Sequence, residues 1–468
     1  MSLLQYFEKR KKTYPQSVKG RFRHIKNNIT WIGLIIYLGL PILRWDRGFA
    51  MPNQGVLIDI PHSRAYFFFI EMWPEEIYYL AGILIFAAVL LFFITSLFGR
   101  VWCGYSCPQT VWVDLFVMVE RLFQGDRNKR IQLDRRSFSF SNIWRKAATH
   151  MVWILIGLIT GFAFVCYFND AFLLIRQLIN FEISFNVWGW VLGIAASTYI
   201  MAGFAREQVC NYMCPYSRFQ SVMFDPDTLI ISYDSDRGEP RGKHKQGDSF
   251  ENRGHCIECK QCVVVCPQGI DIRDGLQMEC IACGLCVDAC DNVMEKIGLP
   301  KGLIRYDTVR NMENKDKTIN TIFKILRPRT FYYSTLLLIV GGIILYNLTF
   351  RSALILNVIP DRNPMFVMLS DGNIRNGYTI KINNKTHENR VYNIKIQGIK
   401  DINLKAVGSS ELNVNNLPVE PGDVGSFKIF AGAKEDSLDI SGKTKIQIVI
   451  TDTKTGESAI KNSVFISK

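Results

Sequence analysis

Five long apolar runs divide the first part of the chain, at about 29–45, 77–98, 148–168, 187–204 and 331–350. A helix needs roughly 20 such residues to cross a bilayer core. The first run is the weakest, because Pro41 and Arg44 shorten it. Tryptophan or tyrosine residues stand near the ends of the first, second, fourth and fifth runs, as they do where helices meet the membrane interface. The pattern predicts five transmembrane helices.

After the last run the period of the apolar residues changes from helical to two. Alternation is clearest at Tyr378–Ile382, Tyr392–Gln397, Ser426–Phe430 and Thr444–Thr451, with Asn, Gly, Asp and Pro between these segments. The length and the strand spacing fit an immunoglobulin-like sandwich of about seven strands. The expected fold class is therefore an α + β membrane protein with an all-β C-terminal domain.

The distribution of basic residues predicts the orientation. Eight Lys or Arg lie in residues 1–28 and nine in 99–147, against two in 46–76 and one in 169–186. The positive side is the cytoplasm, so we expect a multi-pass protein of a bacterial inner membrane. The expected parts are listed in chain order: a cytoplasmic N-terminus (1–28), a four-helix membrane domain (29–204), a cytoplasmic segment (205–330), a fifth helix (331–350) and a periplasmic domain (351–468).

The net charge and the distribution of the cysteines favour some classes of function over others. The net charge is +13, but the basic residues flank apolar runs, which favours lipid headgroups and topology over nucleic acid. The 13 cysteines lie between Cys103 and Cys290, and the last 178 residues contain none. This distribution is typical of metal ligation in a reducing compartment rather than of disulfides.

Eight cysteines form a double ferredoxin pattern within a predicted domain at about 246–300. Each half reads C-x2-C-x2-C-x3-C, and 13 residues separate the two halves. The first three thiolates of a half reach three corners of one cubane, and the fourth ligates the other cluster. The expected ligands of two 4Fe-4S clusters are Cys256, Cys259, Cys262 and Cys290 for the first, and Cys280, Cys283, Cys286 and Cys266 for the second.

A pair of zinc sites is the competing interpretation of this pattern. Zinc would require only two CxxC pairs and would leave the extra cysteine of each half unexplained. One departure from the usual ferredoxin pattern is Asp291, which stands where a proline often follows the last cysteine. We expect ligation to survive this change, with a second loop more open to solvent.

A second set of cysteines follows the second and fourth apolar runs as two CxxxCP motifs. The first holds Cys103 and Cys107, the second Cys210 and Cys214, and an arginine precedes each (Arg100, Arg206). Proline favours the first turn of a helix, so Cys107 and Cys214 are expected at helix N-termini, where the dipole favours the thiolate. The repeated unit predicts that all four sulfurs meet at one redox or copper site.

Simpler interpretations compete for these residues. Helix-end cysteines can pack as small apolar side chains, although the duplication argues against that here. Met213 adds a thioether to the second motif. His24 and His150 lie level with the motifs but are more often satisfied interfacial histidines than ligands. His255 is expected to tune the adjacent cluster, and Cys166 to pack without a partner.

The combination of motifs resembles one protein family. The segment Trp102 to Pro108, the second CxxxCP motif, the double ferredoxin run, a last membrane helix and an immunoglobulin-like tail together resemble the CcoG/FixG (RdxA) cytochrome c oxidase accessory proteins. The resemblance implies reduction of Cu(II) to Cu(I) for a copper-transporting ATPase during assembly of cbb3-type oxidase. It also implies that Cys103, Cys107, Cys210 and Cys214 are the catalytic, copper-handling residues.

Two other functions remain open at this stage. The CxxxCP pair also occurs in membrane components of nitrate and nitrous-oxide respiration that are thought to oxidise quinol, so a quinol-oxidising electron-transfer subunit is one alternative. A non-catalytic scaffold that grips oxidase assembly factors is the other, and it would leave eight cluster ligands unexplained. The sequence leaves the electron donor, the reduction potentials and the oligomeric state open, a homodimer included.

Overall fold

The computed structural model describes residues 12–48, 51–135, 140–243, 250, 253–313, 325–351, 354–370, 372–407, 413–434, 438 and 442–467. The chain forms two compact units. One consists of Met1–Trp45 and Gln54–Ile344, and the other of Asp46–Asn53 and Leu345–Lys468. The first unit contains all the cysteines, and the second contains the β-rich tail.

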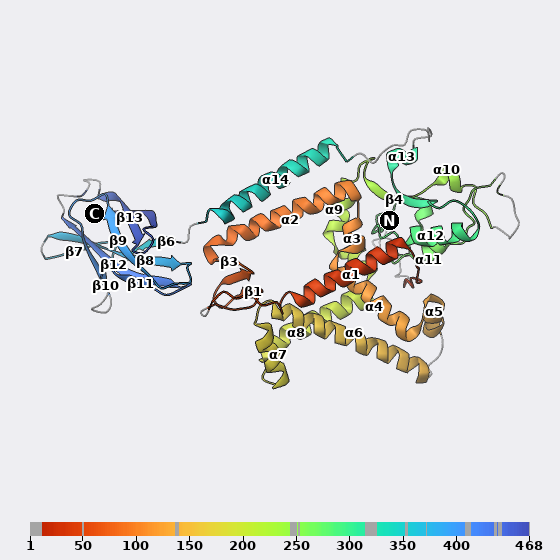
Figure 1. The fold of residues 1–468 in the computed structure, drawn as a ribbon, viewed down its shortest axis with the longest axis horizontal. Helices are drawn as coiled ribbons and strands as arrows, with labels where there is room; N and C mark the ends of the chain where they lie inside the picture. Colours follow the sequence, from red (N-terminus) through yellow and green to blue (C-terminus); the bar gives the residue numbers. More distant parts are fainter. Residues whose placement is uncertain are drawn as a thin grey trace, which may run out of the picture. The chain divides into compact units, whose positions relative to one another are not determined.

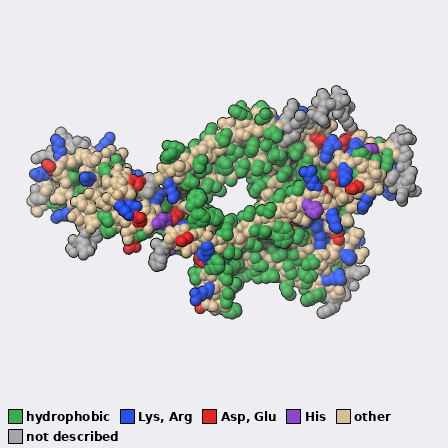
Figure 2. Space-filling view, viewed as in Figure 1, with side chains coloured by type: hydrophobic (Ala, Val, Ile, Leu, Met, Phe, Trp, Pro, Cys, Tyr) green, Lys and Arg blue, Asp and Glu red, His purple; other side chains and the backbone are tan. Residues whose placement is uncertain are grey.

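Four helices in the described residues are long and apolar enough to cross a membrane. They are α2 (Ile77–Phe98), α6 (Phe140–Cys166), α8 (Phe185–Thr198) with its π-helical continuation η3 (Tyr199–Ala205), and α14 (Pro328–Thr349). Figure 2 shows hydrophobic side chains over α2 and α6, whereas Lys and Arg gather over the part of the first unit that carries α5 and α12.

Helix α1 (Arg21–Gly39) corresponds to the first predicted run but is not among those four. It begins eight residues before the predicted start at 29 and ends before Pro41, because proline cannot donate the next helical hydrogen bond. Its first turns are polar and even bury Lys26, so a hydropathy pattern does not detect them. The count of five membrane spans therefore stays a prediction.

Short elements complete the helical part of the first unit. Helices α3 (Val101–Tyr105), α4 (Pro108–Gln124) and α5 (Arg127–Arg135) follow α2, and η4 (Val209–Met213) and α9 (Pro215–Met223) follow η3. The loop after α1 forms a small sheet of β1 (Val56–Asp59), β2 (Arg64–Phe67) and β3 (Ile70–Met72), followed by η2 (Pro74–Glu76). Helix α7 (Ala171–Ile179) joins α6 to α8.

The ferredoxin part extends beyond the predicted range of 246–300. Strand β4 (Leu229–Tyr233) pairs antiparallel with β5 (Ile304–Thr308) and so closes a region of about 80 residues. Between them lie α10 (Ser235–Gly238), α11 (Gln261–Val264), η5 (Ile272–Asp274) and α12 (Leu285–Lys296), and α13 (Val309–Glu313) follows. Figure 1 shows these elements grouped around α12, beside the first turns of α1.

The tail is a two-sheet sandwich. One sheet has the order β10-β12-β8-β6, with β7 paired to β8, and the other has the order β11-β9-β13-β14. The strands are β6 (Leu354–Pro360), β7 (Val367–Met368), β8 (Asn373–Asn384), β9 (Arg390–Gln397), β10 (Asn403–Val407), β11 (Leu417–Val419), β12 (Val424–Lys434), β13 (Lys443–Asp452) and β14 (Ser458–Ile466).

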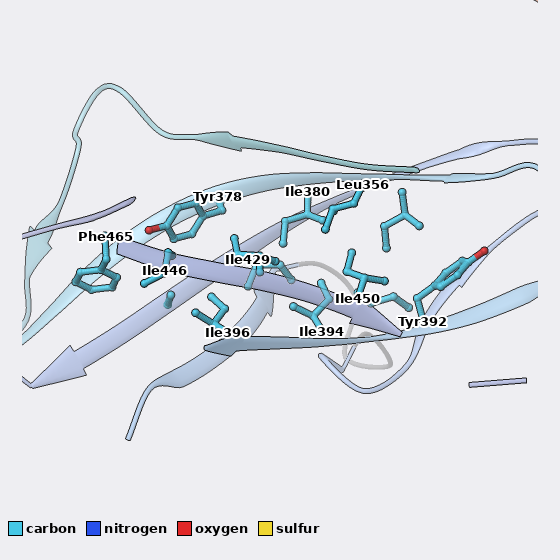
Figure 3. Packing of buried hydrophobic residues seen from close by; sticks show 14 of the residues in the cluster. Leu356, Tyr378, Ile380, Tyr392, Ile394, Ile396, Ile429, Ile446, Ile450 and Phe465 are labelled. Atoms are coloured by element: carbon cyan, nitrogen blue, oxygen red, sulfur yellow. The ribbon is translucent and has the colours of Figure 1, made fainter. Parts of the chain in front are cut away.

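The alternation predicted for this tail is present in its core. All four predicted strand segments lie within β8, β9, β12 and β13. Their inward side chains, such as Ile380, Ile394, Ile429 and Ile450, are fully or almost fully buried and pack between the two sheets (Figure 3). A strand with one buried face produces this period of two.

Candidate functional site

The second ferredoxin loop forms a cavity that is lined by all four predicted ligands of the second cluster and by one of the first. Its walls include Cys266 from the first half together with Cys280, Cys283 and Cys286 from the second. The remaining walls are mostly apolar, with Ile231, Ile270, Ile272 and Ile281, and Cys262 also borders the cavity. The contribution of Cys266 is the cross-over that the ferredoxin spacing predicts.

The other four predicted ligands also lie together. Cys290 is on α12, and its pKa is raised to about 12 by burial and by the nearby thiols of Cys262, Cys259 and Cys256. Cys259 is exposed, whereas Cys256 and Cys262 are buried. Cys290 therefore sits with the first cysteine run, although it belongs to the second run in the sequence.

The surroundings of these thiols suit iron–sulfur clusters. Backbone N–H groups of Gln268 and Ile270 donate to Cys266, and the N–H of Ala282 donates to Cys280. Such hydrogen bonds to sulfur and an apolar shell are what set cluster potentials. Clusters held by these eight cysteines would supply one-electron chemistry.

The four CxxxCP cysteines converge on one place beside the ferredoxin loop. Cys107 is the N-cap of α4 and Cys214 the N-cap of α9, each followed by proline in the first helical turn, as predicted. Burial together with the thiols of Cys107 and Cys210 raises the pKa of Cys103 to about 12. Burial together with Cys107 and Cys214 raises the pKa of Cys210 to about 11.

These raised pKa values have a chemical consequence. A neutral, partly buried thiol gives up its proton only when a cation replaces it, so binding of a metal here would release protons. Within the described part of the chain, no three His, Cys, Asp or Glu side chains are close enough to hold a single metal ion. A cubane binds one thiolate at each of its four irons. It can therefore bridge thiols that lie too far apart to bind one metal ion.

The two motifs have similar backbone conformations at two positions, although the first cysteine lies in the α-helix α3 in one motif and in the π-helix η4 in the other. Four residues before the first cysteine, Gly99 has φ 57° and ψ −127° and Arg206 has φ 35° and ψ −107°. The residues before the prolines also match, at φ −61° and ψ 129° for Cys107 and φ −82° and ψ 111° for Cys214. The internal repeat predicted from sequence is thus present in the structure.

The two arginines that precede the motifs are not equivalent, because Arg100 lies three residues before Cys103 and Arg206 lies four residues before Cys210. Arg206 occupies the position of Gly99, in a backbone conformation that a non-glycine residue adopts at a cost of roughly 1–3 kcal/mol. Its buried guanidinium is held by both oxygens of Glu120, at 2.5 and 3.2 Å, and by the carbonyl of Gly203 at 2.9 Å. These bonds offset the strain and fix the turn that leads to Cys210.

Arg100 instead connects the CxxxCP site to the ferredoxin loop. Its guanidinium donates to the carbonyl of Met278, two residues before Cys280, and to the carbonyl of Ser217 in α9. The same charge lowers the pKa of Cys103, Cys210 and Cys280 against the larger effect of burial. One buried cation is therefore shared by both groups of thiols.

Gly104 allows a direct backbone contact at the same place. A Cβ at this position would lie 2.6 Å from the carbonyl oxygen of Ile281 and 3.0 Å from the Cα of Cys283. Cys103 packs against the buried cluster of Val265, Ile281, Cys283, Leu285 and Ala289. The first CxxxCP motif and the second ferredoxin loop therefore touch without an intervening side chain.

Other candidates from the sequence have ordinary roles. His150 shares a 3.0 Å hydrogen bond with Tyr199 and packs edge-on against Trp153, and His24 is exposed. The Nδ1 of His255 accepts from Arg237 at 2.8 Å, which is a different partner from the cluster predicted for it. Met213 is 59% exposed, and Cys166 is buried in an apolar cluster, as predicted.

Residues 16–23, which lead into and begin α1, bind the ferredoxin part, and no sequence pattern predicted these contacts. The N–H of Gln16 donates to the carbonyl of Val264, and Asn292 donates to the carbonyl of Lys19. Asp288, between two cluster ligands on α12, accepts from the N–H groups of Phe22 and Arg23 at 3.1 and 2.8 Å. The contacts join residues more than 240 positions apart, and no local signal indicates such pairs.

Comparison with known proteins agrees with this geometry. Residues 205–309 match a family model described as a 4Fe-4S dicluster domain, and residues 80–130 match a 4Fe-4S binding domain. Residues 344–468 match the IG-like fold at the C-terminus of FixG. The nitrogen fixation protein FixG of Rhizobium meliloti is 42% identical over 454 residues, which cover 91% of this chain and 87% of that protein. The chain belongs to the FixG/RdxA family.

Protein RdxA of Cereibacter sphaeroides gives the same result, with 42% identity over 443 residues that cover 94% of this chain and 93% of the relative. A solved structure of a FixG-related protein from Vibrio parahaemolyticus is 31% identical, with a TM-score of 0.22, and covers 25% of this chain and 98% of its own. This member of the FixG/RdxA family is a membrane iron–sulfur electron-transfer protein with a C-terminal immunoglobulin-like domain.

Proposed function

We propose that this FixG/RdxA-family protein reduces Cu(II) to Cu(I) at Cys103, Cys107, Cys210 and Cys214. The observation that carries the proposal is the convergence of these four thiols directly against the second ferredoxin loop. Reduction of Cu(II) takes one electron, which matches the one-electron chemistry of 4Fe-4S clusters. Thiolates then stabilise the Cu(I) product, because soft sulfur ligands prefer it.

In this proposal, the clusters bound by the eight ferredoxin cysteines supply the electron. Two clusters would be bound by the two groups of four described above, and the Cu(I) would pass to a copper-transporting ATPase and oxidase assembly factors for a cbb3-type oxidase. The resemblance of motifs and the family membership support this role. The electron donor remains to be identified.

The proposed topology has five spans in a bacterial inner membrane, with the N-terminus and the ferredoxin part in the cytoplasm and the tail in the periplasm. It is supported by the Lys and Arg imbalance between loops and by the lack of cysteine in the tail. Protease added to intact spheroplasts should remove the residues beyond about 351. Full protection of the tail would reverse the orientation.

A further cluster at the CxxxCP cysteines is the second candidate, and one observation favours it. The family model that matches residues 80–130, and so includes Cys103 and Cys107, is described as a 4Fe-4S binding domain. In that case the four thiols would form an electron-transfer site and not the site of copper reduction.

Iron analysis and a reduction assay separate the two candidates. Protein purified without oxygen should contain about eight irons per chain if the CxxxCP site handles copper, and about twelve if it holds a cluster. Serine at Cys103, Cys107, Cys210 or Cys214 should abolish Cu(II) reduction and leave about eight irons in place. Serine at Cys166, which only packs, is the control. Wild-type reduction rates in the Cys103 and Cys210 variants would rule out copper chemistry at this site.

A further inference from the structure

A cavity with a volume of about 40 Å³ borders Cys210. Its walls come from α1, α4 and the ferredoxin loops. The charged side chains that concern us are Arg23 and Lys26 of α1 and Asp114 and Arg121 of α4. We call these four residues the cation pocket.

The cation pocket holds three cations around one carboxylate. Arg23 donates to Asp114 Oδ1 at 2.8 Å, and the Lys26 ammonium lies 3.7 Å from the same oxygen. Burial alone would raise the pKa of Asp114, yet Lys26, Arg23 and Arg121 hold it below its ordinary value. Burial lowers the pKa of Arg121 and the neighbouring Arg23 lowers it further, whereas Asp114 and Asp126 raise it.

The cavity wall also contains buried polar atoms that lack a hydrogen-bond partner. Among the described residues, Asp114 Oδ2, Arg121 Nε and Gln268 Oε1 are buried atoms without a hydrogen-bond partner, and all three residues line the cavity. The contact of Lys26 at 3.7 Å is an ion pair but is too long for a hydrogen bond. Lys26 is only 2% exposed. A buried cation that lacks bonds costs free energy unless another charge offsets it.

The other acidic side chains near the cation pocket already have partners. Arg206, which also lines the cavity, is paired with both oxygens of Glu120. Glu207 accepts from Thr13 and is the charge neighbour of Cys210. Asp126 is 4.0 Å from Arg121 and accepts from Ser17. For the CxxxCP thiols, the cation among the main charge neighbours is Arg100 and not a member of the cation pocket.

We propose that the cation pocket binds a phosphate-like oxyanion, held by Arg23, Lys26 and Arg121, whose donor group or bridging water meets Asp114 Oδ2 and Gln268 Oε1. A tetrahedral oxyanion supplies several acceptors for guanidinium and ammonium donors, and the negative charge offsets the excess. The source is either free inorganic phosphate or the phosphate of an anionic phospholipid, since basic pockets at membrane helices bind such headgroups.

The test uses thermal unfolding of the full-length protein in a neutral detergent. Inorganic phosphate should raise the unfolding temperature relative to chloride at matched ionic strength, because a ligand that binds only the folded state stabilises it. Lys26→Met and Arg121→Met should lose this shift. Lys146→Met is the matched control, since Lys146 is 44% exposed and pairs with Asp134 outside the pocket, and it should keep the shift.

A second experiment identifies the source of the bound anion. The protein is placed in nanodiscs of phosphatidylcholine with or without phosphatidylglycerol, and unfolding is followed again. A shift with phosphatidylglycerol alone assigns the anion to a headgroup, and a shift with phosphate alone assigns it to a free ion. No shift with either, or an equal shift in the Lys26→Met variant, overturns the proposal. In Lys26→Met the Asp114 carboxylate keeps its 2.8 Å ion pair with Arg23. The shift caused by phosphate is measured against the same variant in chloride, so a lower starting stability does not mask it.

Discussion

Asp288 offers the sharpest test of how the ferredoxin part is fixed to helix α1. It lies on α12 between Cys286 and Cys290, is 5% exposed, and binds the N–H groups of Phe22 and Arg23 in the first turn of α1. A helix leaves these N–H groups without internal partners, and an N-cap side chain normally binds them. Here the N-cap is Gly20, and the carboxylate comes from another domain.

The free energy lost when Asp288 is replaced follows from these two hydrogen bonds. Loss of an N-cap acceptor costs about 1 kcal/mol, and loss of a negative charge at a partly buried helix N-terminus costs up to roughly another 1–2 kcal/mol. Asp288→Ala should therefore weaken the contact by about 2 kcal/mol, which corresponds to a roughly 30-fold increase in local opening. Asp288→Asn keeps an acceptor but not the charge, so its effect should be smaller.

Hydrogen exchange followed by mass spectrometry measures this opening. Peptides covering Phe22 and Arg23 should exchange faster in Asp288→Ala, while the iron content stays at the wild-type level. Glu295→Ala on the same helix is the control, because Glu295 is 65% exposed and pairs only with Lys301 at the surface. Exchange at the start of α1 that is equally slow in Asp288→Ala and wild type would refute the capping argument.

Three further predictions concern the other contacts. Gly104→Val should displace residues 281–284, because the Cβ would lie 2.6 Å from the Ile281 carbonyl oxygen, so exchange in this loop should rise with iron retained; exchange equal to that of the wild type would refute the direct contact. Glu120→Gln leaves Arg130 and Arg206 without their buried carboxylate and should cost roughly 3–5 kcal/mol in thermal unfolding, whereas an effect below about 1 kcal/mol would show the network to be dispensable. Ile380→Ala in the tail core should cost about 2–5 kcal/mol and increase cleavage of the tail by protease, unlike Ile460→Ala at a 59% exposed position.

Local spacing predicted the parts of the site that depend on neighbouring residues. Two-residue spacers constrain three thiols of one loop, and a cysteine three residues later leaves that loop, so the grouping of Cys266 with Cys280, Cys283 and Cys286 could be read from the sequence. The CxxxCP repeat likewise predicted four thiols at one place. The strands of the tail followed from their period of two.

Contacts between distant segments could not be predicted in this way. Arg100 and Met278, or Phe22 and Asp288, lie far apart in the chain, and each residue alone has an ordinary local environment. Helix α1 begins in a polar stretch because the ferredoxin part binds its first turn, which outweighs weak local propensity. The hydropathy pattern therefore placed its start eight residues too late.

The two CxxxCP motifs have similar backbone conformations before their prolines but differ in their surroundings. In the first motif, Gly99 provides the turn, Gly104 allows contact with the ferredoxin loop, and Arg100 donates to the carbonyl of Met278. In the second, Arg206 itself provides the turn, its side chain is bound by Glu120, and Asn211 stands at the position that corresponds to Gly104. The close backbone contact with the ferredoxin loop therefore depends on a glycine that only the first motif has, so the duplicated motifs are not equivalent in the folded protein.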